Sequence, residues 1–365
     1  MSRMRINIGP IHPSTHGVIR LVADVEGDTI IDVEPHIGFL HRGVEKLMET
    51  RMYMQNPSYT EKLDYVAPMG WDDLYVSSVE HAIGVELNDA AQYARMILLE
   101  LQRIASHLLW LGTLANDLGQ MFTIFMWAFK DRAKVLKMLE NITGTRMFYV
   151  NFRLGGLSSE FPIDFEDRIY ELTDYLEEHI REYQDHLDSS SIFMERTKNI
   201  GVLTKYDALR YGATGPVARA SGIDFDVRKK MPYYMYKKIK FNNPVLSGGD
   251  CYDRYRIRYQ EMFDSIEIIR TAIENLPKKQ SIKGAPIKLI GQNAKPDIVI
   301  QHRELPRGEG IIYLVPDAQR PYRIGLRTPS YANLSLLKHM IKGVKYADLF
   351  AIFGSLDVVA AEIDK

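Results

Sequence analysis

The sequence predicts an α+β protein, mainly α, with a β-hairpin near the N-terminus and a small β-element near the C-terminus. Two observations carry this prediction. Residues 18–35 alternate apolar and polar side chains as a strand does, whereas most apolar positions between residues 89 and 275 recur at helical spacing. Strand-like runs return at 311–315 and 322–326. Helices therefore supply most of the expected core.

The hairpin comes first, because Glu26-Gly27-Asp28 places a tight turn between two strand-like runs. Asn88 and Asp89 then form an N-cap and an acidic first turn for a long helix. We expect helices over 89–116, 120–142, 164–188, 250–275, 330–341 and 346–353, and a loop-rich region over 198–250. We divide the chain into an N-terminal hairpin region (1–50), a helical core (51–275) and a C-terminal part (276–365) packed on that core.

Composition excludes several classes of function. The 365 residues include 46 basic and 47 acidic side chains, so no broad positive field attracts nucleic acid. Cys251 is the single cysteine, whereas a disulfide needs two thiols and an iron-sulfur cluster about four. No short apolar stretch with a cleavage site follows Met1, and we expect the chain to stay in the cytoplasm.

One apolar stretch imitates a membrane span. Between Arg103 and Lys130 the only full charge is Asp117. Glycines and polar residues around it divide the stretch into halves of about a dozen residues, the size of buried core helices. We therefore expect core helices, with Asp117 at their junction, where a carboxylate is costly unless it is paired.

The most unusual segment is Gly9-Pro10-Ile11-His12-Pro13-Ser14-Thr15-His16-Gly17. Its prolines and glycines predict a loop before a strand. Three interpretations stay open: a zinc site on the His12 and His16 pair, histidines that only satisfy backbone groups, or a polar loop that presents His16 to a ligand. A second segment, 57–65, has the pattern of an amphipathic helix start, and Tyr65 at its end is by itself compatible with a core tyrosine.

Six segments together resemble the family of the 49 kDa, or D-type, subunit of complex I, the NADH-quinone oxidoreductase. They are GPIHPSTHG (9–17), PHIGFLHRGVEK (35–46), YTEKLDY (59–65), LELQRIASHLLWLG (99–112), RASG (219–222) and GSLDVV (354–359). The resemblance implies a fold like that of the nickel-iron hydrogenase large subunit, to which this family is related. The resemblance to the 49 kDa subunit family covers nearly the whole chain.

The resemblance also implies a quinone site. The family residues that match Tyr65 and His16 hydrogen-bond the quinone oxygens, and the one that matches Asp117 pairs with the histidine. A phenol and an imidazole suit this role because a quinone that accepts two electrons takes up two protons. His12 and Lys62 are expected near the quinone and the iron-sulfur cluster of the adjacent subunit. This chain is expected to bind no cofactor alone.

Three departures from related patterns carry further expectations. Hydrogenases hold nickel through two CxxC pairs, and the corresponding segments here, 64–67 and 359–362, contain no cysteine, so we expect no metal. Many family members have an arginine at the position of Lys62 and a histidine at that of Phe148. Phe148 cannot take up a proton, which predicts a partner cluster of low potential and weak pH dependence, suited to a low-potential acceptor.

The resemblance implies an assembly as the active form. Expected partners are a small cluster-bearing subunit of the B type, a C-type subunit, an H-type membrane subunit and further peripheral-arm subunits, on the cytoplasmic face of the cell membrane. Quinone reduction would be coupled to proton translocation.

Alternatives are a non-catalytic scaffold in the same complex and a membrane-bound hydrogenase or sulfur-reductase relative. The electron donor, whether NADH, ferredoxin or deazaflavin, would enter through other chains. No GxGxxG follows a strand, so a nicotinamide should bind elsewhere. The compact length favours an archaeal deazaflavin type that reduces methanophenazine.

Overall fold

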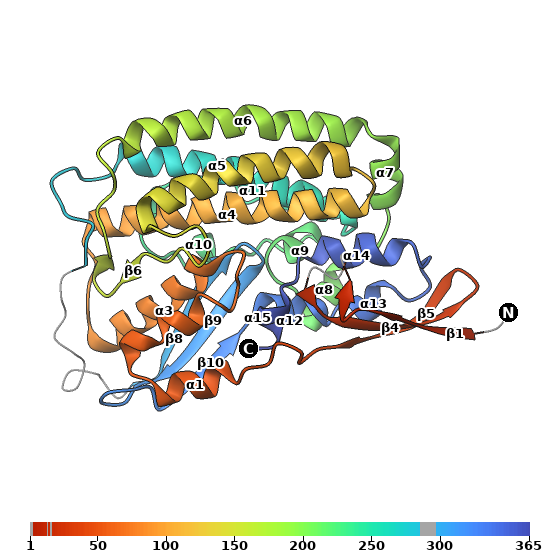
Figure 1. Ribbon diagram of the computed structural model, residues 1–365, viewed down its shortest axis with the longest axis horizontal. Coiled ribbons are helices and arrows are strands. Elements are labelled where there is room, and N and C mark those ends of the chain that lie inside the picture. Colours follow the sequence, from red (N-terminus) through yellow and green to blue (C-terminus); the bar gives the residue numbers. More distant parts are fainter. Residues whose placement is uncertain (1–2, 13, 15–16, 285–296) are drawn as a thin grey trace.

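Four long helices form a bundle, and two three-stranded antiparallel sheets lie beside and below it (Figure 1). The computed structural model describes residues 3–12, 14, 17–284 and 297–365. The bundle consists of α4 (Asp89–Asp117), α5 (Met126–Thr143), α6 (Phe165–Ser189) and α11 (Cys251–Glu274). These helices confirm the four long helices that the sequence predicts, with boundaries that move by one or two residues, apart from the start of α5.

Helix α4 is the centre of the bundle because it packs against both α5 and α11. The predicted cap is present: the Asn88 side chain accepts a hydrogen bond from the Ala91 N–H at 2.8 Å. Between α4 and α5 the chain makes a π-helical turn, η3 (Met121–Phe125), and α5 ends at Gly144 with φ 78°. The break places Asp117 at the last position of α4, half-buried, as the sequence indicates.

The apolar stretch of residues 103–130 is thus shared between α4, η3 and α5. Its buried members, such as Leu108, Leu111 and Leu114, lie in the main hydrophobic core. Among the helices that the structure describes, none has both the length and the apolar character needed to cross a membrane.

The N-terminal sheet has the order β1-β4-β5, and its strands are β1 (Arg3–Ile8), β4 (Arg20–Glu26) and β5 (Thr29–His36). Glu26 pairs with Thr29, which leaves Gly27 and Asp28 as the turn, and Gly27 has φ 66°. The predicted hairpin is therefore confirmed, and β1 adds a third strand. A short ribbon of β2 (Ile11–His12) and β3 (Gly17–Val18) lies between β1 and β4 in the chain.

The C-terminal sheet has the order β10-β9-β8, with β8 (Val299–Leu305), β9 (Gly308–Val315) and β10 (Arg323–Arg327). The strand-like runs at 311–315 and 322–326 correspond to β9 and β10. The sequence pattern does not reveal β8, because Arg303 and Glu304 are adjacent and both are buried. Ion pairs to Asp73 and Arg219 offset the free-energy cost of burying these two charges. The sequence of β8 therefore lacks the alternation of apolar and polar residues that is typical of a strand.

Shorter elements connect the bundle and the sheets. They are α1 (Val44–Thr50), η2 (Tyr53–Gln55), α2 (Pro57–Thr60), α3 (Pro68–Ile83), β6 (Phe152–Arg153), β7 (Gly156–Leu157), α7 (Ser191–Thr197), α8 (Lys205–Tyr211), α9 (Gly215–Ala220), α10 (Val227–Lys230), η4 (Tyr236–Lys238), α12 (Pro329–Leu334), α13 (Leu337–Met340), α14 (Asp348–Leu356) and α15 (Ala360–Ile363). The predicted helix 330–341 is split into α12 and α13. Helix α3 packs on β8 and β9. Almost all of its side chains are buried, including polar ones, so it has no polar face exposed to solvent.

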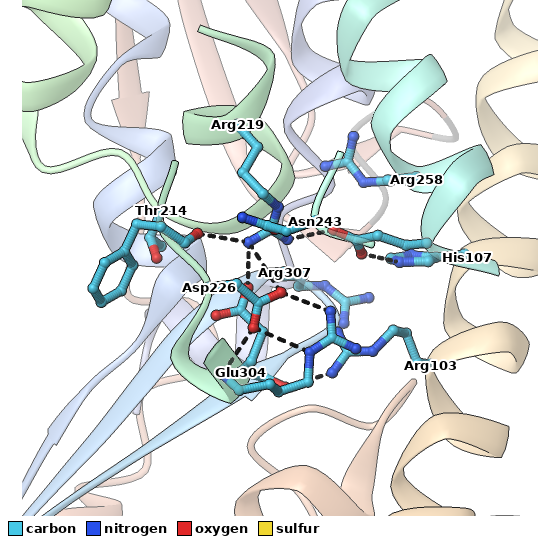
Figure 2. A network of polar contacts seen from close by, with 12 residues as sticks. Arg103, His107, Thr214, Arg219, Asp226, Asn243, Arg258, Glu304 and Arg307 are labelled. Atoms are coloured by element: carbon cyan, nitrogen blue, oxygen red, sulfur yellow. Dashed lines mark hydrogen bonds and ion pairs between the residues drawn. The ribbon is translucent and has the colours of Figure 1, made fainter. Parts of the chain in front are cut away.

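A buried ionic network joins the bundle to the C-terminal sheet (Figure 2). At its centre Arg219 of α9 donates to Glu304 of β8 at 2.9 Å and contacts Glu261 of α11. Glu261 also pairs with His107 of α4 at 2.8 Å. All four side chains are fully or nearly fully buried, so each charge depends on its partner.

This network yields a test of stability. Arg219→Leu leaves the Glu261 and Glu304 carboxylates buried without their main counter-ion, and the free energy of unfolding should fall by about 3–5 kcal/mol. The control is Arg181→Leu, which breaks an exposed pair with Glu177 and should cost less than about 1 kcal/mol. Denaturant unfolding of the full chain measures both. Equal losses in the two variants would contradict the interpretation.

Candidate functional site

Tyr65 lies in a sharp bend of the chain and not in a helix. The helix start that the sequence indicates in the segment 57–65 is present as the single turn α2 (Pro57–Thr60), which ends before Tyr65, and α3 begins at Pro68. The cause is Asp64, whose Oδ1 accepts hydrogen bonds from the N–H groups of Val66 and Ala67 at 3.0 and 3.1 Å. These side-chain bonds replace the helical pattern and turn the backbone. Tyr65 therefore stays 38% exposed within a largely buried region.

The N-terminal loop reaches both Tyr65 and Asp117. A Cβ atom built on Gly17 would lie 3.5 Å from the Tyr65 hydroxyl, and Gly17 has φ 146°. Ser14 Oγ donates to Asp117 Oδ1 at 2.9 Å. The structure thus brings the loop and the two predicted residues from α4 and the bend into one region. His16, the third of the predicted catalytic residues, lies outside the described residues.

His12 has a structural environment in this loop. Its ring stacks on Phe350, with 5.5 Å between ring centres, and its Nδ1 accepts a hydrogen bond from the Ser14 N–H at 3.2 Å. These contacts fit the interpretation that this histidine satisfies a backbone group and fixes the loop.

A buried ionic cluster anchors the bend at Tyr65 through Asp64. Arg307, in the turn between β8 and β9, donates to Asp64 Oδ2 at 2.5 Å and lies 3.5 Å from Asp357. Arg258 of α11 lies 3.7 Å from the other Asp357 oxygen. Glu362 completes the cluster: its Oε1 accepts from the Trp71 indole at 2.8 Å and its Oε2 contacts Ser330. Sequence reasoning missed Arg307 and Asp357, because their partners come from distant segments.

Burial shifts the acidity of this cluster. It raises the pKa of Tyr65, and the neighbouring Asp64 carboxylate raises it further. It also raises the pKa of Asp64, a rise that the Arg307 guanidinium opposes. Burial and the charge of Asp64 raise the pKa of Glu362 to about 7. The surroundings of Tyr65 therefore favour its protonated form and can hold a further proton near neutral pH.

The two segments expected at the positions of the hydrogenase cysteine pairs do meet. Val66 packs against Val359 and Ala361, with Leu40 and Leu109 at the edge of this small apolar cluster. Within the described ranges, no group of three or more His, Cys, Asp or Glu side chains is arranged to hold a metal ion.

Lys62 and Phe148, the two departures from the family pattern, also lie together. Lys62 Nζ is 5.2 Å from the centre of the Phe148 ring and donates to the Ser58 carbonyl at 2.8 Å. Nearby, Ser58 and Glu61 are among the residues that border a cavity of about 550 Å³, which Tyr65 and Asp117 do not line. Lys62 and Phe148 thus contact each other, and both are partly exposed.

Comparison with known proteins identifies the family. The family of the respiratory-chain NADH dehydrogenase 49 kDa subunit matches residues 117–365. The D-type NADH-quinone oxidoreductase subunit of Dehalococcoides mccartyi is 43% identical over 361 residues, which cover 99% of this chain and 98% of the relative. The second D-type subunit of Koribacter versatilis is 41% identical (99% and 96% covered), and that of Geotalea uraniireducens 40% (99% and 98%).

These matches all concern one class of protein, subunits of respiratory NADH dehydrogenase complexes. The chain belongs to the 49 kDa, or D-type, subunit family of NADH-quinone oxidoreductase. This confirms the family that the sequence motifs indicate.

The raised pKa of Tyr65 can be tested directly. Fluorotyrosine placed at position 65 should titrate at higher pH than fluorotyrosine at Tyr206, which is 70% exposed, as followed by fluorine NMR. Asp64→Asn should move the pKa at position 65 toward that of the control, because it removes the adjacent negative charge. Coincident titrations at the two positions would contradict the proposed environment.

Proposed function

We propose that this chain is the quinone-site subunit of a complex I-type dehydrogenase, in which a quinone-like carrier is reduced by two electrons from a partner's iron-sulfur cluster. The observation that supports this most strongly is the position of Tyr65. Its side chain is partly exposed, its hydroxyl lies beside Gly17, which follows His16 in the chain, and its backbone is anchored by buried ion pairs. Membership of the 49 kDa subunit family supports the same function.

The chemistry assigns a role to each residue. Reduction of a quinone by two electrons makes its oxygens basic, and the two protons come from the Tyr65 phenol and the His16 imidazole. Asp117 orients His16 and favours its protonated form. The contact from Ser14 to Asp117 supports this assignment, because Ser14 precedes His16 by two residues and ties the loop to the end of α4.

Electrons reach the site from a partner. Cys251 is the only cysteine and is buried, so this chain supplies no set of thiolates for a cluster. We assign the partner's cluster to the side of Lys62 and Phe148, with a B-type subunit as its carrier. C-type, H-type and further peripheral-arm subunits complete the assembly, which holds the chain at the cytoplasmic face of the membrane and couples quinone reduction to proton translocation.

The acceptor is a quinone or a related low-potential carrier such as methanophenazine. The electron donor, whether NADH, ferredoxin or deazaflavin, enters through other subunits. A hydrogenase activity is disfavoured by the apolar side chains of Val66, Val359 and Ala361 where thiolates would be needed.

Substitution of Tyr65 and His16 tests the proposed site. In the purified complex, Tyr65→Phe and His16→Ala should lower quinol formation by about 100-fold, because each removes a proton donor to the reduced quinone. Reduction of the partner's cluster, followed by EPR, should be unchanged. Tyr206→Phe, on an exposed face, is the matched control. Normal quinol formation by both site variants in an intact complex would favour a scaffold role.

Lys62 and Phe148 yield a separate prediction. The potential of the partner's terminal cluster should depend weakly on pH in the wild type. Phe148→His adds a titratable group at a residue with φ 51°, a conformation that histidine accepts better than most residues. The potential should then approach a slope of about 59 mV per pH unit around the pKa of the histidine. Met147→His, at an exposed neighbour, is the control. A steep slope in the wild type would refute the assignment.

A further inference from the structure

The cluster beneath Tyr65 contains more acidic than basic groups. Asp64, Asp357 and Glu362 supply three carboxyl groups, and Arg307 and Arg258 supply two guanidinium groups. All five side chains are buried or nearly buried. Full ionisation would therefore leave one uncompensated negative charge away from water, which is costly. The charges of the cluster balance if one of the three carboxyl groups keeps a proton.

The arrangement of the ion pairs assigns this proton to Glu362, because Asp64 and Asp357 lie beside guanidinium groups. Within the part of the chain that the structure describes, Asp64 accepts hydrogen bonds from the Val66 and Ala67 N–H groups and from Arg307, which stabilise its ionised form. Glu362 Oε2 instead accepts from the Ser330 N–H at 3.2 Å and contacts the Ser330 hydroxyl, which can accept as well as donate, and among the described residues no guanidinium group lies within ion-pair distance of Glu362. Its other oxygen accepts from Trp71.

The surroundings of Glu362 come from four elements. The charged and titratable groups that act on it are Asp64 from the bend and Arg307 from the turn between β8 and β9. From α3 and α12 it receives the indole of Trp71 and the hydroxyl of Ser330. Burial and the charge of Asp64 raise its pKa to about 7, so it exchanges its proton in the neutral range.

The cluster is also close to the phenol. A Cβ atom on Gly17 would lie 3.5 Å from the Tyr65 hydroxyl and 3.7 Å from the Ala360 nitrogen, at the start of α15, which carries Glu362. Ser330 links Glu362 to Val359, the residue before α15, because its Oγ contacts the Glu362 carboxyl and also accepts from the Val359 N–H at 3.1 Å. Glu362 thus lies on the element that borders Gly17, and Gly17 in turn borders the Tyr65 hydroxyl.

We propose that Glu362 is the proton reservoir that restores Tyr65 between turnovers, an inference that rests on the proposed quinone site. Tyr65 gives its phenolic proton to the reduced quinone and becomes a phenolate. The O–H bond of Glu362 then breaks, its proton passes by way of the Ser330 hydroxyl and water to the phenolate oxygen, and Glu362 is left as a carboxylate. Glu362 regains a proton from solvent. Glu362 touches no substrate and acts through Tyr65.

The test separates the first turnover from later ones in the assembled complex. Glu362→Gln keeps the size and polarity of the side chain but carries no exchangeable acid. Tyr65 starts protonated, so a single turnover of the pre-reduced complex with quinone should stay within about twofold of the wild type. Steady-state quinol formation should fall about tenfold, and its pH dependence near pH 7 should disappear.

Two further variants make the outcome decisive. Ser330→Ala removes the first proton carrier while keeping Glu362, and should show the same difference between single and steady-state turnover. Glu309→Gln, a carboxyl change on β9 that pairs with His302 and Arg327, should show neither effect. The proposal is overturned if Glu362→Gln keeps its steady-state rate and pH profile, or if both phases fall equally. Failure of the quinone site itself would appear separately, as normal activity of Tyr65→Phe.

Discussion

Buried pairs of guanidinium and carboxylate groups are the constraint on which the rest of this structure depends. The segment from β8 to β9 contributes Arg303, Glu304 and Arg307, and each finds its partner on a different element: Asp73 on α3, Arg219 on α9 and Asp64 in the bend. A buried charge without its partner costs several kcal/mol. The C-terminal sheet can therefore dock on the helices in one register, the one that satisfies all these pairs at once.

The same constraint creates the candidate site. Asp64 performs two tasks, because one of its oxygens turns the chain at Tyr65 and the other accepts from Arg307. The phenol is thereby held at the edge of the core, where it stays partly exposed although its backbone is fixed. The N-terminal loop is tied to α4 through Ser14 and Asp117. Two segments that are far apart in sequence thus meet at the candidate site, and each is anchored independently of any ligand.

In the proposed function, this arrangement fits a separation of electron transfer and proton transfer between subunits. Where a hydrogenase would need thiolates, Val66, Val359 and Ala361 form an apolar contact. The carboxyl cluster and Tyr65 offer groups that can take up and release protons. In the proposed function the partner therefore supplies electrons, from the side of Lys62 and Phe148, while this chain supplies protons and the position of the acceptor. In the proposed function, proton uptake and release by the side chains of this subunit change the charge of the site.

Much of the fold and the family could be predicted from the sequence alone. The helical period and the Asn88 cap define the boundaries of α4, the turn at Gly27 defines the hairpin, and ordered motifs indicate the 49 kDa subunit family. The structural signals are local, because period and capping depend on neighbours in the chain. Sequence reasoning did not reveal β8, α3, the bend at Tyr65 or the Arg307 cluster. There, buried charges replace the expected apolar pattern, and whether a charge can be buried depends on a partner hundreds of residues away. Only the tertiary structure brings those partners together.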